Sequence, residues 1–225
     1  MKRLFLIAYM CCMTFGAFAQ DDKILAVKSV SVEVAAIKTA ANLAKFGYAT
    51  YSPISLIEAA RIFGTTKVQD AGLKATRGID VLPEEKGSKV SFDPAQLLAD
   101  AKRWAGKDKT ILALIKKVEK EIAAAGSVRG AVGGPKEQKD LVYGYDYNVY
   151  NIKFRSNELA EVCLSGDGDT DLDLYVYDSN GNLIGSDTDY SDDCMVRWIP
   201  AWSDVFIIKV VNNGSVYNNF IIWTN

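Results

Sequence analysis

Residues 166–178 read GDGDTDLDLYVYD, and this stretch decides the fold of the C-terminal part of the chain. Four aspartates fall at every second position, and the chain then turns apolar and aromatic. Alternate side chains of a β-strand share a face, so the pattern predicts a strand with one apolar and one polar face. The residues predicted to point into the core are Leu172, Leu174 and Val176, and those predicted to line the outer face are Asp171, Asp173, Tyr175 and Tyr177.

The whole segment 141–225 has the composition of an antiparallel β protein. Short runs rich in β-branched and aromatic residues, such as LDLYVYD, CMVRWI and DVFIIKVVN, are separated by turn signals. The clearest turn signal is Asn180-Gly181, which predicts a hairpin. About seven such strands predict a small β-sandwich of the jelly-roll type.

Acidic residues gather in the same segment and raise the question of a metal site. Residues 161–193 contain ten Asp or Glu and no Lys or Arg. The alternating aspartates from Asp167 fit the start of an EF-hand loop, but Leu172 and Asp178 stand where that loop needs Gly and Glu. A calcium site of another geometry is predicted if this loop meets the second acidic cluster, SDTDYSDD, because hard oxygen ligands suit Ca²⁺. The candidate ligands are Asp167, Asp169, Asp171, Asp173, Asp187, Asp189, Asp192 and Asp193. The alternative is a solvated acidic sheet edge that discourages pairing with other strands.

Tyrosines supply candidate ligand-binding positions. Exposed aromatic rings stack on sugars or on a protein partner, and the alternative is ordinary packing in a small sandwich. Tyr143, Tyr145 and Tyr147 alternate along the chain and are predicted to share a face. The candidate ligand-binding residues are Tyr143, Tyr145, Tyr147, Tyr175 and Tyr177.

The N-terminus has the pattern of an export signal, with Lys2 and Arg3 ahead of an apolar run that ends in a small-x-small motif. Cleavage is predicted after Ala19, so residues 1–19 form the signal peptide and the mature protein is secreted or periplasmic. An oxidising compartment favours a disulfide between Cys163 and Cys194. Two separately buried thiols are the alternative.

Residues 20–125 predict a small helical domain. Ser52 and Asp93 are each followed by proline, which gives an N-cap and a proline at the first helical position. Asp108 is predicted to cap a further helix that runs to the end of this domain. The domain fold predicted for the mature chain is therefore α+β in two parts, a helical domain followed by an antiparallel sandwich.

The predicted boundaries follow from glycines and from charge. A first helix is predicted over 24–46, ending at Gly47. Residues 65–92 lack periodicity and are predicted to form a loop with at most a short helix. Residues 126–140 are predicted to be a Gly-rich linker. Residues 20–140 carry 20 Lys or Arg against 15 Asp or Glu, whereas 141–225 carry 4 against 13.

The chain contains no histidine. This excludes Ser-His-Asp and Cys-His catalysis and histidine-ligated zinc, and a non-enzymatic protein is predicted. Nucleic acid is not expected as a partner, because the β part is acidic and the basic excess elsewhere is small and dispersed. No membrane span is expected in the mature chain.

The segment 141–225 resembles the bacterial pre-peptidase C-terminal domain. The resemblance is carried by a strand of the type Asp-x-Asp-Leu-Tyr-Val, a turn and a later Val-x-Asn type segment. The matching positions are Asp171, Asp173, Leu174, Tyr175, Val176 and Val210–Asn212. The resemblance implies a jelly-roll sandwich on a secreted protein that aids secretion or binds polysaccharide or protein, with calcium in some relatives. No protease domain precedes it here, so protease activity is not implied.

Together these features predict a secreted binding or accessory protein whose acidic sandwich binds an extracellular glycan or protein, with structural calcium as its cofactor. The alternative is a structural role in which the basic helical part docks on the acidic sandwich and no small ligand is bound. The opposite charges of the two parts motivate this alternative.

Overall fold

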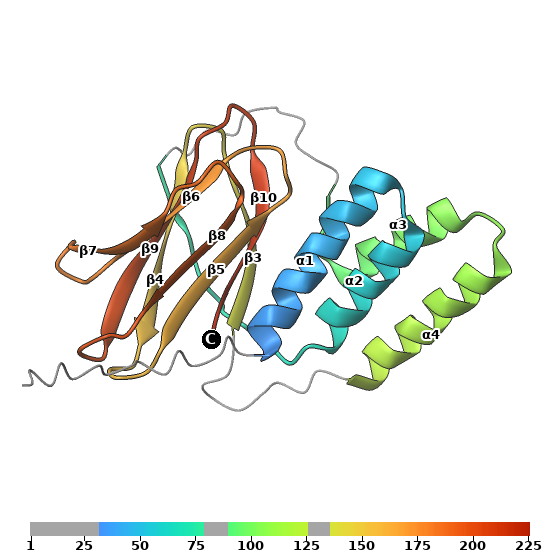
Figure 1. Cartoon of the computed structure of the whole chain (residues 1–225), viewed down its shortest axis with the longest axis horizontal. Helices are drawn as coiled ribbons and strands as arrows, with labels where there is room; N and C mark the ends of the chain where they lie inside the picture. The colour runs from blue at the N-terminus through green and yellow to red at the C-terminus, as the bar shows by residue number, and fades with distance from the viewer. Residues whose placement is uncertain (1–31, 79–89, 126–135) are drawn as a thin grey trace, which may run out of the picture.

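The computed structural model describes residues 32–78, 90–125 and 136–225, and in these ranges helices form one layer beside two packed sheets (Figure 1). The helices are α1 (Val32–Thr50), α2 (Pro53–Thr65), α3 (Pro94–Ala105) and α4 (Lys109–Ala125). The strands are β1 (Gln69–Asp70), β2 (Thr76–Arg77), β3 (Lys136–Val142), β4 (Tyr147–Phe154), β5 (Ala160–Gly166), β6 (Leu172–Tyr177), β7 (Leu183–Asp187), β8 (Asp193–Trp198), β9 (Asp204–Asn212) and β10 (Asn218–Thr224).

The strands form two five-stranded sheets. Sheet A has the order β1-β3-β10-β5-β8 and sheet B has the order β2-β4-β9-β6-β7. Strands β3 to β10 pair with one another in antiparallel fashion and follow the double Greek-key path of a jelly roll. The predicted fold class, helices followed by an antiparallel sandwich of jelly-roll type, is confirmed.

The interior between the two sheets follows the period-two pattern of the sequence. Leu172, Leu174 and Val176 of β6 are fully buried in it, as predicted. Phe206, Ile208 and Val210 of β9 alternate in the same way and pack in the same cluster. The residues between them, both polar and apolar, point to the outer face of sheet B, which is accessible.

Helix starts are fixed by the caps that the sequence predicts. The Ser52 hydroxyl accepts a hydrogen bond from the Ser55 N–H (3.3 Å), and the Asp93 carboxylate accepts one from the Gln96 N–H (2.9 Å). Asp108 accepts from the Thr110 and Ile111 N–H groups at the start of α4. Each cap satisfies backbone donors that have no partner within the helix.

The predicted end of the first helix is wrong, and packing gives the reason. Helix α1 continues past Gly47 to Thr50, and the left-handed residue is Tyr51, with φ 52°. A Cβ at position 47 would lie 2.5 Å from Cδ2 of Leu56. Gly47 therefore lets α1 and α2 approach closely. The predicted start of this helix at residue 24 lies outside the described residues.

Two short edge strands connect the helical part to the sandwich, where the sequence predicted a loop. β1 pairs in parallel with β3, and β2 pairs antiparallel with β4. No short helix is present in the described residues of the 65–92 segment. The predicted linker, 126–140, is corrected at its end because β3 begins at Lys136, and the rest of it lies outside the described residues. A two-residue strand shows no periodicity, so the sequence gives no signal for it.

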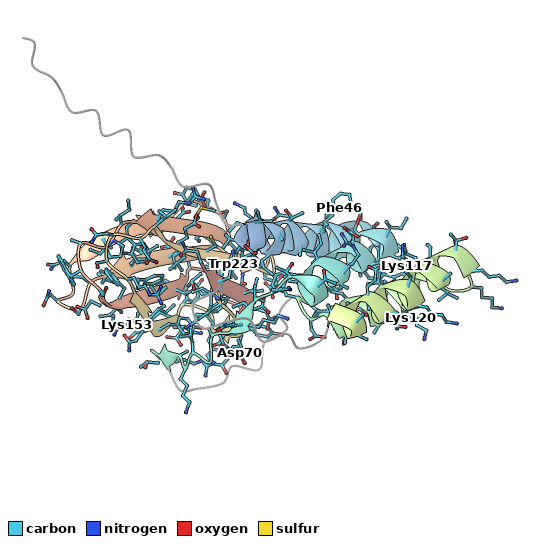
Figure 2. The ribbon with its side chains drawn as sticks, turned by 90° about the horizontal axis from the view of Figure 1, so that it is seen from below. Phe46, Asp70, Lys117, Lys120, Lys153 and Trp223 are labelled. Atoms are coloured by element: carbon cyan, nitrogen blue, oxygen red, sulfur yellow. The ribbon has the colours of Figure 1, made fainter. Side chains whose placement is uncertain are left out.

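The helices cover the outer face of sheet A through an apolar interface. Trp223 and Ile221 of β10 are 1% and 0% exposed and belong to the same core cluster as Ile37 and Ala41 of α1. Figure 2 shows Trp223 at the junction of the two layers. The helical layer and the sandwich therefore share one hydrophobic core, so apolar contact as well as charge holds them together.

The predicted disulfide is not present. Cys163 and Cys194 are both free and buried. They lie on adjacent strands, but Cys163 is paired with Met195, one position out of step with Cys194. Neighbouring positions on paired strands point to opposite faces, so the Cys163 thiol packs against the helices and the Cys194 thiol lies between the sheets. The thiol of Cys194 donates a hydrogen bond to the Leu172 carbonyl at 3.0 Å.

We expect the protein from Gln20 onward to contain two free thiols and to unfold at the same temperature with and without dithiothreitol. Burial raises the pKa of the Cys163 thiol to about 12, so the folded protein should react slowly with thiol reagents. Thiol titration in guanidinium without reductant, beside thermal unfolding, measures both properties. A protein without titratable thiols that melts earlier in dithiothreitol would contradict the placement of the cysteines on opposite faces.

Candidate functional site

The outer face of sheet B is the open face of the sandwich. Its members come from the outward positions of three paired strands, and we call this surface the sheet B face. They are Tyr147, Val149, Asn151 and Lys153 of β4, Val205, Ile207, Lys209 and Val211 of β9, and Asp173, Tyr175 and Tyr177 of β6. The helices of the described part of the chain lie on the opposite side, against sheet A (Figure 1).

Register places these residues in rows across the sheet. Lys209 has Val149 on one side and Tyr175 on the other. In the next row, Ile207 is paired with Asn151 and with Tyr177. The face is thus a grid in which aromatic, aliphatic and polar groups have fixed spacings, because cross-strand partners lie about 5 Å apart.

Two tyrosines and an aspartate on β6 form a fixed group. The Tyr175 hydroxyl donates a hydrogen bond to Oδ2 of Asp173 at 3.0 Å. The rings of Tyr175 and Tyr177 are nearly parallel, with centroids 6.4 Å apart and planes inclined by 19°. Burial first, and then the hydrogen bond to Asp173, raises the pKa of Tyr175. Asp173 is 9% exposed, so the carboxylate is largely withdrawn beneath the tyrosine hydroxyl.

On the β4 side of the grid, a lysine lies against an aromatic ring. Nζ of Lys209 is 4.3 Å from the centroid of the Tyr147 ring. This is within the range of a favourable cation–π contact. The ring holds the ammonium in place and leaves its N–H donors available, since an aromatic face is a weaker acceptor than a carboxylate.

Only part of the predicted tyrosine set lies on this face. Tyr147, Tyr175 and Tyr177 are brought together, but Tyr143 and Tyr145 are not. They lie in a turn between β3 and β4, where Tyr145 has φ 55° and donates its N–H to the Gly214 carbonyl at 2.8 Å. The prediction of one shared face failed because a turn breaks the period of two.

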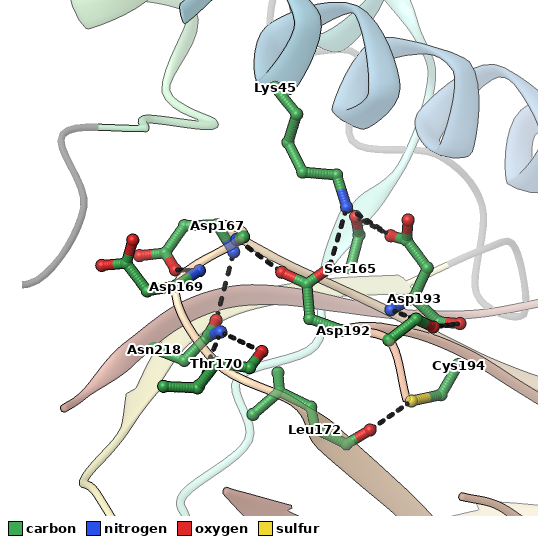
Figure 3. A network of polar contacts seen from close by, with 12 residues as sticks. Lys45, Ser165, Asp167, Asp169, Thr170, Leu172, Asp192, Asp193, Cys194 and Asn218 are labelled. Atoms are coloured by element: carbon green, nitrogen blue, oxygen red, sulfur yellow. Dashed lines mark hydrogen bonds and ion pairs between the residues drawn. The ribbon is translucent and has the colours of Figure 1, made fainter. Parts of the chain in front are cut away.

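The two acidic loops do meet, at the rim of the sandwich beside α1 (Figure 3). Asp192 makes the junction: its carbonyl accepts a hydrogen bond from the Gly166 N–H at 2.7 Å, and its carboxylate accepts one from the Gly168 N–H. A left-handed φ of 94° at Gly168, which favours glycine, lets the chain turn at this point. We call the region formed by residues 166–171 and 187–193 the acidic rim.

Within the acidic rim, Asp167 is 3% exposed and bonded to asparagine. Its carboxylate accepts hydrogen bonds from the backbone N–H and the side-chain amide of Asn219, at 3.0 and 2.9 Å. Burial raises its pKa to about 6, although these hydrogen bonds act in the opposite direction. Asn218 supports the same loop by accepting from the Asp167 N–H and donating to Thr170. Sequence reasoning missed both asparagines, whose signal was a pair of polar residues at the start of the otherwise apolar strand β10.

A lysine from the helical layer reaches the acidic rim. Nζ of Lys45 lies 3.1 Å from Oδ1 of Asp192 and 2.8 Å from Oδ1 of Asp193. The same oxygen of Asp193 accepts a hydrogen bond from the Ser165 hydroxyl. Lys45 is part of α1, far from the rim in sequence, and no local pattern marks it as a partner. It supplies one positive charge where two carboxylates meet.

The other predicted metal ligands have separate partners. Asp171 accepts from the side-chain amide of Asn213, Asp187 accepts from the Met195 N–H at 2.8 Å, and Asp189 accepts from the Ser191 hydroxyl. Asp169 lies on the 166–171 loop with its N–H 3.3 Å from Oδ1 of Asp167. Within residues 32–78, 90–125 and 136–225, no three acidic or cysteine side chains are arranged to hold a metal ion. The eight aspartates therefore do not converge on one point.

Comparisons with known proteins complete the description of the site. No family model and no curated protein matches the sequence. Similar solved structures include a mitogen from Yersinia pseudotuberculosis (14% identity, 41% of this chain and 85% of that one, TM-score 0.34). A periplasmic inhibitor of g-type lysozyme from Aeromonas hydrophila also matches (16% identity, 44% and 91%, TM-score 0.33). So does a carbohydrate-binding module of Cellvibrio mixtus lichenase 5A in complex with cellotriose (11% identity, 41% and 87%, TM-score 0.26). Likeness at this level carries no argument about function.

In the described part of the chain, no helix is long and apolar enough to cross a membrane.

We expect Lys45→Met to lower the free energy of unfolding by roughly 1–2 kcal/mol at low salt, because it removes a partly buried ammonium from between two carboxylates. Lys120→Met on the exposed surface of α4 is the matched control and should leave stability unchanged. Urea unfolding at low and at 1 M NaCl measures both variants, and salt should narrow the difference. Equal stabilities at low salt would show that Lys45 does not stabilise the docked helices.

Proposed function

We propose that this chain is an exported, non-enzymatic binding protein and that the sheet B face binds an extracellular glycan or protein. The observation that carries the proposal is the difference between the two outer faces of the sandwich. The helices cover the outer face of sheet A, whereas the outer face of sheet B presents Tyr147, Tyr175 and Tyr177 beside aliphatic residues. An accessible mixed aromatic and aliphatic surface on rigid strands supports a binding role.

The side chains on this face suit recognition better than catalysis. Rings of tyrosine supply contact area at a low cost in conformational entropy, and their hydroxyls supply directional hydrogen bonds. Asp173 is the acidic member of the face, and a pair of carboxylates flanking one bond is not formed there. The 225 residues of the chain include no histidine. These features support a binding protein without an enzymatic centre.

Replacing Tyr175 or Tyr177 by alanine should weaken binding to the cognate ligand by roughly tenfold, because central aromatic contacts dominate interface energies. Tyr190→Ala, at a fully exposed site outside the sheet B face, is the control. The measurement is a screen of a glycan array and of extracellular proteins, followed by titration of the variants. A ligand whose affinity is lost in Tyr190→Ala and kept in the other two variants would place the binding surface elsewhere.

Export and the family resemblance belong to the same proposal. The export signal and its cleavage after Ala19 lie outside the described residues, and a secreted or periplasmic location is what an extracellular ligand requires. The resemblance to the pre-peptidase C-terminal domain rests on the β6 strand, where Asp173 and Tyr175 form the group described above, and on Val210–Asn212 of β9. Membership of that family is proposed on these positions.

Structural calcium at the acidic rim stays a prediction, supported by the meeting of the two loops through Asp192. A ligand at one hundred times its dissociation constant stabilises the native state by about 2.7 kcal/mol. We expect a saturable rise in the unfolding temperature when calcium replaces EDTA, and its loss in Asp169→Asn. Ser179→Ala in the β6–β7 turn is a control outside the rim. An unchanged unfolding temperature would leave the rim as a set of carboxylates satisfied by Lys45 and by backbone donors.

A further inference from the structure

The basic residues of the sandwich are not spread evenly over an acidic body. The segment 141–225 carries 4 Lys or Arg against 13 Asp or Glu, yet Lys153 and Lys209 both lie on the sheet B face. The acidic member of that face is Asp173, which is 9% exposed and bonded to the Tyr175 hydroxyl. The accessible charge on the sheet B face is therefore positive, whereas the acidic rim is negative.

Neither lysine is neutralised by a carboxylate of the described residues. The ion pairs of this part of the chain involve other cations, among them Lys45, Arg77 and Arg197. Lys209 rests on the Tyr147 ring, and Lys153 is exposed at the far end of β4. Lysines that sit among apolar neighbours without a counterion favour a ligand that brings its own negative charge.

The distance between the two lysines indicates how far apart the negative charges of the ligand lie. Lys209 of β9 is paired with Val149 of β4, and Lys153 lies four residues after Val149 on β4. At the rise of a β-strand this separation is about 13 Å. Asn151 and Ile207 lie between the two charges. Lys153 also lines a hollow of about 230 Å³ together with Ile152, Ile222 and Lys136 of β3, among others, so this hollow lies at the edge between the two sheets and not on the sheet B face. The arrangement suits an extended ligand with charges at intervals.

We propose that the ligand of the sheet B face is an acidic polysaccharide of the polyuronate class. Its carboxylates would pair with Lys209 and with Lys153, and its sugar rings would lie over Tyr147, Tyr175 and Ile207. This inference rests on the proposed binding function and gives it a substrate class.

An acidic polysaccharide fits this surface better than an acidic peptide. An extended peptide laid across the sheet would bring backbone N–H and C=O groups onto Val149, Ile207 and Val211, which offer them no partner, and unsatisfied polar groups are costly to bury. Pyranose rings instead present apolar C–H faces to such a surface, while their hydroxyls at the ring edge reach Asn151 and the tyrosine hydroxyls. Each row across the sheet combines apolar with polar side chains, and this combination matches that ligand.

The test compares polygalacturonate with its methyl ester, which keeps the sugar backbone and removes the charge. Binding of the protein from Gln20 onward is titrated at low salt and at 0.5 M NaCl. We expect the protein to bind polygalacturonate, to bind the methyl ester at least tenfold more weakly, and to lose affinity at the higher salt concentration. Lys153→Met combined with Lys209→Met should lower the affinity for polygalacturonate by about tenfold.

The matched control is Lys117→Met combined with Lys120→Met, which removes the same charge from α4 at the opposite end of the molecule (Figure 2). This variant should bind as the wild type does. Equal effects of the two double variants would overturn the inference, because the effect would then report net charge alone. Circular dichroism and thermal unfolding of each variant establish that the fold is intact.

Two further outcomes separate this inference from the function on which it rests. Equal, tyrosine-dependent binding of the methyl ester and of polygalacturonate would overturn the polyuronate assignment and leave the sheet B face as a glycan-binding surface. Equal binding of poly-L-glutamate and polygalacturonate would also overturn the assignment, in favour of an acidic protein partner. Absence of binding to every probe by the folded wild type would overturn the inference, and the array screen would then decide the proposed function.

Discussion

The burial of sheet A on both faces is the constraint on which the rest of the structure depends. All seven residues of β5 are buried, and six of the seven residues of β10 are buried as well. A sheet that faces water on one side alternates between buried and exposed residues, whereas these strands are buried on both sides. Trp223 and Ile221 would be exposed without a cover, and the helices provide it. The position of the helical layer follows from this requirement.

The same requirement explains why the two parts of the chain are not independent units. Helix α1 buries small residues, Ala40 and Ala41, in the same core cluster as the large indole of Trp223. The strands β1 and β2 then tie the chain after α2 to the edges of both sheets. Lys45 adds a polar contact at the margin of this apolar interface. Because ion pairs near the surface contribute little, the burial of apolar surface supplies most of the stability of this interface.

Sequence reasoning reached the elements that local rules determine. The alternation around Leu174 gave the strand, its inward face and the sandwich, and proline after Ser52 or Asp93 gave the starts of two helices. Features that depend on how a strand is paired with its neighbour could not be predicted from local sequence patterns. The register of β5 against β8 decides that Cys163 and Cys194 face opposite sides.

Long-range contacts and short elements were missed for related reasons. Lys45 meets the acidic rim only because α1 docks on sheet A, a contact that no spacing in the sequence encodes. Of the five candidate tyrosines, Tyr147, Tyr175 and Tyr177 follow the period of a strand and lie on the sheet B face, whereas Tyr143 and Tyr145 lie in a turn where that period stops. The asparagines that hold the acidic rim, Asn218 and Asn219, bond to residues far away in the chain.

Covering one face of the sandwich leaves the other as the surface where recognition can be built without loss of stability. On the sheet B face the inward residues already fill the core, so the outward positions are free to carry tyrosine and lysine. Because β4, β9 and β6 are hydrogen-bonded along their lengths, the side chains on them keep fixed spacings before a ligand arrives. Preorganisation of this kind lowers the entropy lost on binding. A surface with regular rows of this sort is better matched to a repeating, extended ligand than to a compact one.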